Sequence, residues 1–314
     1  MKLGVIGLNE GNGHPFSYSA MFNGYDPKEL IDRCPFALIK EYLPREHRNE
    51  VFIDNANVTH VWTQNKKLSE DVAKVSLIPN IVSHYEDMIG QVDGVILARD
   101  DPWNHWEMAK PFIKRGIPIF IDKQLTSTVH DFEALTAAAG DGYPIMACSP
   151  MRYTRDVVGL QKQKPISKTL SIHGVSRVSW IRYGHHLLEG VTPIWGYNVK
   201  SVQSLCAKPD HDIVQIIYED GLNIIFEFME NVALPIQYTC FQEGEEPFSI
   251  RFQDFFHGFR AMMMDFTRVV ETGEQAIPFE EIKDIAKIVL AGCLSKESNG
   301  ISISPRTLEP LDRS

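Results

Sequence analysis

The stretch Gly116-Ile-Pro-Ile-Phe-Ile-Asp-Lys-Gln-Leu-Thr-Ser127 begins as a short apolar run and ends just after a charged pair, Asp122-Lys123. A continuous apolar run of this kind suits a strand that is buried on both faces of a parallel sheet. In an open α/β sheet, ligands bind at the carboxyl ends of such strands. We therefore expect Lys123 at the edge of the main crevice. The alternative is a surface lysine that simply follows a strand.

Similar strand candidates recur on both sides of this stretch, and helical segments separate most of them. The strand candidates are Lys2–Ile6, Thr59–Thr63, Asn80–Ser83, Asp93–Ala98 and Tyr143–Cys148, and the helical ones are Ser69–Ser76, Tyr85–Gly90, His105–Arg115 and Val129–Ala139. A long polar segment, Tyr25–Asn57, separates the first helix from the second strand. Alternation of strands and helices predicts a Rossmann-type, doubly wound parallel sheet. We assign residues 1–149 to this α/β domain.

The pattern changes after Pro150, where strand candidates follow one another with few helices between them. They are Ser176–Tyr183, Lys200–Leu205, Asp212–Glu219, Asn223–Met229, Ile236–Phe241 and Phe248–Phe252. This order predicts a large, mostly antiparallel sheet. Two helices, Phe255–Glu271 and Phe279–Lys296, follow it. We predict an α+β domain over residues 150–314 that binds substrate and joins copies of the chain, as a dimer or tetramer, through its sheet.

Composition narrows the range of partners. The 314 residues are 44% hydrophobic and 23% charged, with a net charge of -10, which argues against nucleic acid because phosphate binding needs clustered Lys and Arg. No apolar run is long enough to span a bilayer, and no signal peptide precedes the first strand, so we expect a cytoplasmic protein without a membrane partner. The five cysteines are scattered, which fits reduced thiols and neither disulfides nor a metal site.

A glycine-rich turn, Gly7-Leu-Asn-Glu-Gly-Asn-Gly13, joins the first strand to a helix that has Pro15 in its first turn. Glycines let the backbone approach a pyrophosphate, and the helix N–H groups point at it. Asn9 and Asn12 stand where the usual G-x-G-x-x-G motif has its second and third glycines. The turn therefore predicts dinucleotide contacts at Gly7, Asn9, Gly11, Asn12 and Gly13, with an ordinary strand-to-helix turn as the alternative.

The end of the second strand bears on the choice between NAD and NADP. An acidic residue usually ends this strand in NAD-binding domains and holds the ribose hydroxyls, but here the residue is Gln64. A neutral residue followed by Lys66 and Lys67 would tolerate or favour the 2′-phosphate of NADP. Alternatively, the two lysines are solvated residues that open a helix.

Taken together, these segments resemble the glucose-fructose oxidoreductase / inositol dehydrogenase / rhizopine-catabolism (Gfo/Idh/MocA) family over nearly the whole chain. The family carries Glu-Lys-Pro after its fifth strand, where this chain has Asp122-Lys123-Gln124. The family often has Thr-Pro-x-x-x-His after its fourth strand; here Asp100-Asp101 replaces Thr-Pro and His105 matches. The resemblance implies cofactor contacts around the ends of these two strands. The candidates are Arg99, Asp100, His105, Asp122 and Lys123.

A second family motif, Asp-x-Gly-x-His-x-x-Asp, opens a helix and places its histidine at the catalytic site. The corresponding run here is Arg182-Tyr-Gly-His-His-Leu-Leu-Glu189, in which Gly184 and His186 match. Glu189 is a conservative change, whereas Arg182 replaces the first acidic residue. The resemblance implies that His186 is the catalytic base, with His185 as a substitute. Alternatively, these histidines cap backbone groups at the start of the helix.

Oxidation of a sugar hydroxyl needs a hydride acceptor, which the nicotinamide supplies, and a base, a role for which the ordinary pKa of histidine is suited. Lys123 would stabilise negative charge on the substrate oxygen. Arg152 and Tyr153, in a segment similar to the family's Asn-x-Arg-Phe, and Arg182 would hold a substrate carboxylate or phosphate, because arginine offers a two-pronged donor. Glu189 and Trp195 complete the substrate candidates, although core packing is an alternative use of Trp195.

We therefore expect an NAD(P)-dependent oxidoreductase that acts on a sugar, cyclitol or sugar derivative, with no metal. One alternative is a noncatalytic dinucleotide-binding sensor or regulatory protein, which the altered glycine turn, Gln64, Gln124 and Arg182 favour. The presence of both Lys123 and His186 argues against it, because a pure binder needs neither. Another alternative is a lyase or epimerase that keeps NAD in a closed redox cycle.

Overall fold

The structure is a computed structural model that describes residues 1–45, 52–140, 142–163, 168–253 and 255–308. The chain divides into two compact units, each assembled from separate segments. The first unit comprises Met1–Thr126, Ala134–Ala147 and Phe259–Phe279, and the second comprises Ser127–Glu133, Cys148–Gly258 and Glu280–Ser314. The boundary predicted between residues 149 and 150 lies near the change of unit at Ala147. The assignment of domains stays a prediction.

The first unit is built around a six-stranded, all-parallel sheet, as predicted. Its strands are β1 (Lys2–Ile6), β2 (Asn57–Trp62), β3 (Asn80–Ile81), β4 (Gly94–Leu97), β5 (Ile119–Ile121) and β6 (Ile145–Met146), in the spatial order β3-β2-β1-β4-β5-β6. The order reverses between β1 and β4, and this switch point is where doubly wound sheets bind ligands. Every residue of β4 and β5 is buried, as the apolar runs predicted.

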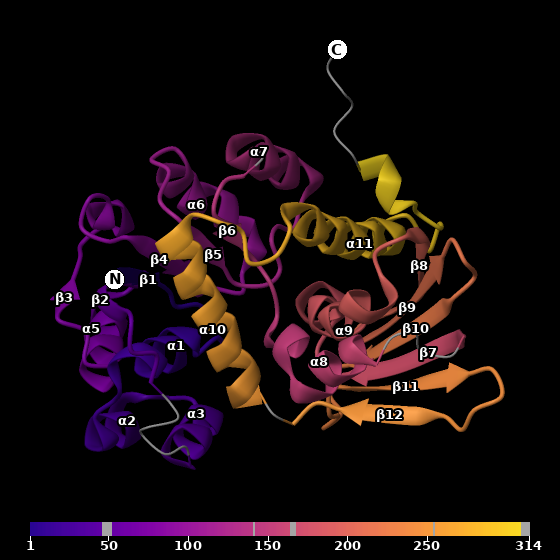
Figure 1. Ribbon diagram of the computed structural model, residues 1–314, viewed down its shortest axis with the longest axis horizontal. Helices are drawn as coiled ribbons and strands as arrows, with labels where there is room; N and C mark the ends of the chain where they lie inside the picture. Colours follow the sequence, from indigo (N-terminus) through magenta and orange to yellow (C-terminus); the bar gives the residue numbers. More distant parts are fainter. Residues whose placement is uncertain (46–51, 141, 164–167, 254, 309–314) are drawn as a thin grey trace. The chain divides into compact units, whose positions relative to one another are not determined.

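Helices flank this sheet and connect its strands (Figure 1). They are α1 (His14–Asn23), α2 (Pro27–Arg33), α3 (Ala37–Tyr42), α5 (Lys66–Val75), α6 (His105–Ile113) and α7 (Val129–Ala139). Sequence reasoning did not predict α2 and α3, which lie within the long polar segment before β2. The start of α2 has a local cause, because the Asp26 carboxylate accepts the N–H groups of Lys28 and Glu29.

Helix α10 (Phe255–Thr272) comes from a distant part of the sequence, yet most of it packs in the first unit. The ring of Phe266 lies 5.9 Å from that of Phe120 in β5. A Cβ atom on Gly94 in β4 would lie 2.6 Å from the side chain of Val270. Figure 1 shows α10, in orange, beside α1 of the same unit. Units defined by contacts therefore do not follow the order of the chain.

The second unit holds a six-stranded sheet in which only β7 and β10 pair in parallel. Its strands are β7 (Thr169–Ser176), β8 (Val199–Lys208), β9 (His211–Tyr218), β10 (Asn223–Met229), β11 (Gln237–Gln242) and β12 (Phe248–Arg251), in the order β12-β11-β7-β10-β9-β8. Buried and half-buried residues alternate along β9 and β10, so one face packs against the core. The predicted large, mostly antiparallel sheet is confirmed.

Three helices belong wholly or largely to this unit: α8 (Arg155–Lys162), α9 (Trp180–Trp195) and α11 (Phe279–Glu297). The strand predicted at Ser176–Tyr183 is wrong, because Ser176 ends β7 and Trp180 begins α9. The indole of Trp180 is buried, and Cβ atoms on Gly184 or Gly292 would lie within 2.6 Å of it. Trp180, which lies within the predicted strand, thus begins a helix and packs against Gly184 and Gly292.

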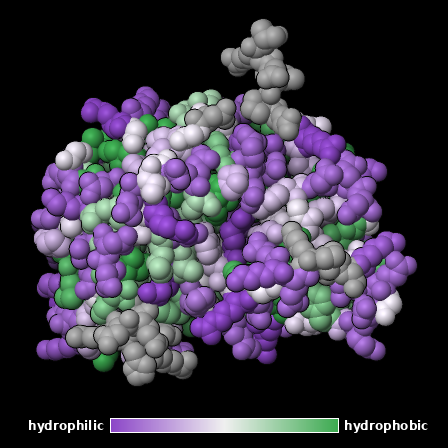
Figure 2. All heavy atoms as spheres, in the orientation of Figure 1, coloured by the Kyte–Doolittle hydropathy of each residue, from purple (hydrophilic) through white to green (hydrophobic). Residues whose placement is uncertain are grey.

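In the part of the chain that the structure describes, no helix combines the length and apolar character needed to cross a membrane. On the face drawn in Figure 2, hydrophobic residues are interspersed among hydrophilic ones.

Candidate active site

The glycine turn after β1 is tightly packed on one side and offers backbone donors. A Cβ atom on Gly7 would lie 2.2 Å from the ring of Pro15, and one on Gly13 would lie 2.7 Å from the ring of Phe36. Gly11 has φ +82, a conformation that favours glycine. Among the described residues, no acceptor forms a hydrogen bond with the N–H group of Gly11 or with that of Gly13. The turn therefore suits an anion such as a pyrophosphate, although it departs from the usual motif.

Lys123, Asp100 and Asn9 lie together at the carboxyl edge of the first sheet. The Asn9 amide donates to the Asp100 carboxylate, and the Asp100 N–H donates back to Asn9 Oδ1 at 3.0 Å. Lys123 is only 4% exposed, and its Nζ lies 3.5 Å from Asp100 Oδ2. Asn9 thus does what a glycine in its place could not, because it fixes the carboxylate that pairs with the lysine.

Asp122 forms a second cluster beside it. Asn12 Nδ2 donates to Asp122 Oδ2 at 3.1 Å, His14 Nδ1 binds the same oxygen, and the Lys123 N–H donates to Oδ1 at 2.9 Å. Burial raises the pKa of Asp122, but the charges of His14 and Lys123 outweigh it, so the pKa lies below its ordinary value. The carboxylate is therefore ionised at neutral pH.

Sequence reasoning missed His14, the first residue of α1. Its ring stacks on Tyr18 at 4.6 Å between centroids and meets the edge of Phe259 at 5.2 Å. A histidine directly after the glycine turn was the available signal, but its partner Asp122 is 108 residues away.

The segment that leads into α5 holds the turn in place from the other side. Gln64 Oε1 accepts the Leu8 N–H at 2.9 Å and an Arg99 N–H at 3.3 Å. Arg99 is buried, and its guanidinium pairs with Asp101. Both side chains therefore support the loops, while Lys66, the first residue of α5, is exposed at the same edge.

His105 is fully buried between two loops of this edge. Its Nδ1 lies 3.0 Å from the Leu125 carbonyl, and its Nε2 lies 3.0 Å from the Arg99 carbonyl. Burial lowers the pKa of His105 against the opposing effect of these two hydrogen bonds. The histidine joins the loops after β4 and β5; a direct contact with a cofactor stays a prediction.

In the second unit, His186 lies on α9 and is hydrogen-bonded to Ser149. Ser149 Oγ is 2.6 Å from His186 Nδ1 and also accepts the Met151 N–H at 3.2 Å. His186 is 6% exposed, and the ring of Tyr183 meets it edge-on. Helical spacing places Arg182, His186 and Glu189 on one side of α9. Sequence reasoning did not single out Ser149, the partner of the imidazole.

Glu189 and Arg152 form the centre of a buried network. Arg152 donates to Glu189 at 2.6 Å, to Glu281 at 2.8 Å and to the Tyr197 hydroxyl at 2.8 Å. Burial raises the pKa of Glu189, but Arg152 and His185 outweigh it and lower the pKa below its ordinary value. All three guanidinium nitrogens of Arg152 are engaged within the unit. A substrate carboxylate would therefore have to displace a protein partner.

The remaining substrate candidates lie in different surroundings. His185 is fully buried, with Nε2 3.3 Å from Glu189. Burial raises the pKa of Tyr153 well above its ordinary value. Arg182 is exposed near the start of α9. Trp195 donates to Thr169 Oγ1 at 2.9 Å and packs against Tyr238, which agrees with the packing alternative.

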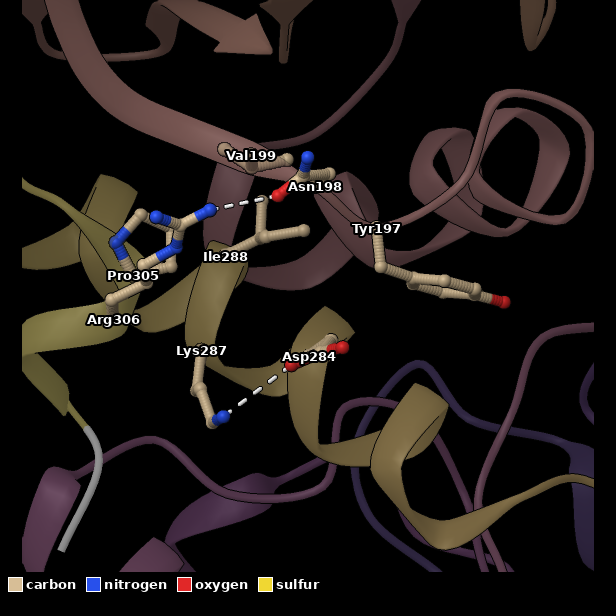
Figure 3. A pocket seen from close by; sticks show the side chains of 8 residues that line it. All are labelled: Tyr197, Asn198, Val199, Asp284, Lys287, Ile288, Pro305 and Arg306. Carbon is tan, nitrogen blue, oxygen red and sulfur yellow. Dashed lines mark hydrogen bonds and ion pairs between the residues drawn. The ribbon is translucent and has the colours of Figure 1, made fainter. Parts of the chain in front are cut away.

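The second unit also has a cavity of about 300 Å³ that none of the predicted residues lines. Its walls are Tyr197, Asn198, Val199, Asp284, Lys287, Ile288, Pro305 and Arg306. Figure 3 shows the Lys287 ammonium directed at Asp284 and the Arg306 guanidinium directed at Asn198. Both cations of the cavity therefore have partners within the second unit.

Comparison with known proteins supports the resemblance. Residues 41–142 match the GFO_IDH_MocA model, described as an oxidoreductase family with an NAD-binding Rossmann fold. No curated protein matches the sequence significantly.

Solved structures match the fold over nearly the full length of the chain. A probable dehydrogenase from Thermotoga maritima is 13% identical with a TM-score of 0.73, over 98% of this chain and 100% of that one. A myo-inositol dehydrogenase from Lactobacillus casei, in complex with NAD(H) and myo-inositol, is 11% identical with a TM-score of 0.74, over 96% of each chain. A scyllo-inositol dehydrogenase from the same organism, with NAD(H) and scyllo-inositol, is also 11% identical with a TM-score of 0.74, over 97% of this chain and 99% of that one.

At these identities the solved structures support the fold alone, whereas the match to the family model is one of sequence and covers residues 41–142. Residues 41–142 of this chain therefore match the model of the oxidoreductase family with an NAD-binding Rossmann fold, and its fold is similar to that of solved inositol dehydrogenases.

Proposed function

We propose that the protein is an NAD(P)-dependent oxidoreductase that transfers a hydride between the nicotinamide and a hydroxyl or carbonyl carbon of a sugar, cyclitol or sugar derivative. The observation that carries the proposal is Lys123, a buried cation held 3.5 Å from Asp100 at the carboxyl edge of a parallel sheet. A cation held in a dry environment stabilises negative charge on a reacting oxygen far better than one in water.

The residues of the first unit fit the dinucleotide. The N–H groups of Gly11 and Gly13 would hold the pyrophosphate, and the Gln64 amide would lie near the ribose. Gln64 carries no negative charge and Lys66 is exposed, so a 2′-phosphate would meet no repulsion from either side chain. When bound, the nicotinamide accepts or supplies the hydride.

The other roles fall to residues of the chain itself. Lys123 would stabilise charge on the substrate oxygen, and His186 would take or return its proton. With Nδ1 bound to Ser149, the Nε2 atom of His186 would be the nitrogen that takes or returns the proton. His185 is buried against Glu189, which supports His186 as the base in preference to His185.

The first test is binding of NAD and NADP to the purified protein, measured by thermal shift. A ligand that binds only the folded state raises the melting temperature with its concentration. A shift with either dinucleotide supports the proposal and identifies the preferred cofactor. No shift with either, oxidised or reduced, contradicts it.

A screen of inositols and sugars for NAD(P)H formation then tests turnover, with Lys123→Met and His186→Ala as controls. A noncatalytic dinucleotide-binding protein remains the second candidate, favoured by the engagement of all three Arg152 nitrogens with protein groups. That protein would bind the dinucleotide and turn over no substrate in the screen.

Association into a dimer or tetramer through the second sheet also stays a prediction, which light scattering tests.

A further inference from the structure

Gln124, the residue after Lys123, carries a buried amide without a partner. The residue is 3% exposed, and among the described residues neither its Nε2 nor its Oε1 has a hydrogen-bond partner. Native proteins pair nearly all such atoms, because burying an amide without hydrogen bonds is costly. An amide with both its donor and its acceptor unsatisfied therefore needs an explanation.

The loop that carries Gln124 is held on both sides. Before it, the Asp122 carboxylate binds Asn12 and His14. After it, the Leu125 carbonyl binds His105. A loop fixed at these points has little freedom to carry the amide to another partner. It also lies at the carboxyl end of β5, the edge of the sheet where ligands bind.

We propose that Gln124 binds the carboxamide of the nicotinamide ring. The Nε2–H would donate to the carboxamide oxygen, and Oε1 would accept one of its N–H groups. One planar ligand group would thereby satisfy both atoms, because primary amides present a donor and an acceptor side by side. The inference rests on the proposed use of a nicotinamide dinucleotide and extends it to a residue specific to this chain, since the motif that it resembles has proline here.

Ligands that differ only at the nicotinamide end test this proposal. ADP-ribose lacks the nicotinamide, and 3-acetylpyridine adenine dinucleotide replaces the carboxamide NH₂ by a methyl group. Dissociation constants of the full chain for NAD, for ADP-ribose and for the analogue are measured by calorimetry. We expect the protein to bind NAD about tenfold more tightly than the analogue, the usual scale for loss of a buried hydrogen bond.

Gln124→Met has nearly the same shape without hydrogen-bonding groups. We expect it to weaken NAD about tenfold, to leave ADP-ribose within about twofold, and to remove the discrimination between NAD and the analogue. Gln215→Met is the matched control, because Gln215 bonds Asn223 in the second sheet. It should change none of the three constants.

Each of the following outcomes would overturn the assignment. Equal affinity of the unmodified protein for NAD and the analogue would do so without any variant, even if Gln124→Met failed to fold. Unchanged NAD binding by Gln124→Met would indicate that the amide serves a water or a substrate hydroxyl. Equal losses for NAD and ADP-ribose would indicate a structural role. If the unmodified protein bound ADP-ribose but not NAD, this inference would fall; if it bound neither, the proposed function would fall with it.

Discussion

Each unit buries a cation beside a carboxylate, but Lys123 and Arg152 are held differently. Arg152 donates to Glu189, Glu281 and Tyr197 at 2.6–2.8 Å, so each of its nitrogens completes the architecture of the second unit. Lys123 pairs with Asp100 at 3.5 Å, and Asp100 is itself positioned by Asn9. The printed contact of Lys123 is thus longer than those of Arg152. We therefore predict that Arg152 contributes mainly to stability, and the role of Lys123 in function stays a prediction.

The largest expected effect is on stability, at Arg152. Arg152→Met leaves Glu189 buried without its cation, so we expect the free energy of unfolding to fall by about 3–5 kcal/mol. Urea denaturation measures it. Arg182→Met, at an exposed position on the neighbouring helix, should change it by less than about 0.5 kcal/mol. If Arg152→Met lowered the free energy of unfolding by less than about 1 kcal/mol, the predicted contrast between Arg152 and Lys123 would be wrong.

At Lys123 the order of effects should be reversed. We expect Lys123→Met to lower turnover about 10²–10³-fold, because charge on the substrate oxygen loses its stabilising cation. Its unfolding free energy should fall by only about 1–2 kcal/mol, since Asp100 keeps its bonds with Asn9. Lys110→Met, in an exposed part of α6, is the control for charge alone. Equal turnover in both variants would remove Lys123 from the proposed mechanism.

The dependence of the unfolding free energy on acid pH tests the comparison of the two units further. Each unit has a buried carboxylate whose pKa is lowered, Asp122 in the first and Glu189 in the second. A carboxylate with a lowered folded pKa stabilises the protein above its unfolded value, and the effect is lost as pH falls through the folded one. For Glu189 and Asp122, stability should therefore be lost below the ordinary values of 4.5 and 3.8.

Glu189→Gln should reduce the slope of unfolding free energy against pH below 4.5, by up to about 1.4 kcal/mol per pH unit for the one proton involved. Denaturation at pH 7 and at several acid values measures that slope. Glu243→Gln, at an exposed position, should leave it unchanged. An unchanged slope in Glu189→Gln would mean that Arg152 does not hold this carboxylate ionised.

Ser149 supplies a smaller effect within the second unit. Ser149→Ala removes the bond to His186 Nδ1, and we expect turnover to fall about tenfold with a shifted pH profile and unchanged cofactor affinity. Thr192→Val removes a buried hydroxyl that bonds Leu188 in the same helix and does not touch the imidazole. If both variants lost turnover equally without a change in pH profile, Ser149 would be a packing residue only.

The smallest effect concerns a third cation, exposed Lys66. We expect Lys66→Ala to lower the affinity for NADP relative to NAD by about three- to fivefold, because a solvent-exposed ion pair contributes less than about 1 kcal/mol. Thermal shift with both dinucleotides measures the ratio. Lys67→Ala is the natural control, since Lys67 already pairs with Asp71. No change in the ratio would indicate that Lys66 does not reach the 2′-phosphate.

Local patterns predicted the sheets, but not the contacts that make the candidate site. Two local patterns predicted strands: the apolar runs of β4 and β5, and the alternation along β9 and β10. Both depend only on residues close together in the sequence. The strand predicted at Ser176–Tyr183 was wrong, because the chain leaves β7 at Ser176 and enters α9 at Trp180.

The site depends on pairs that are distant along the chain. His14 meets Asp122 across 108 residues, and Ser149 meets His186 across 37. A histidine or a serine alone does not reveal which partner it has. The end of an apolar run pointed to Lys123 and the resemblance to a family pointed to His186, whereas His14 and Ser149 needed the structure.

The return of α10 to the first unit bears on how the protein is made. Three residues of α10 pack against residues of the first unit: Phe259 against Tyr18, Phe266 against Phe120, and Val270 against Gly94. The residues of the first unit are synthesised more than a hundred residues before their partners in α10. We therefore expect the apolar surface around Tyr18, Phe120 and Gly94 to stay exposed on the nascent Rossmann sheet while the second sheet is synthesised. A fragment that stops at residue 149 would keep this surface exposed, so it should aggregate or recruit chaperones where the full chain does not. The first sheet is thus translated before the second, and a helix that follows the second sheet completes its packing.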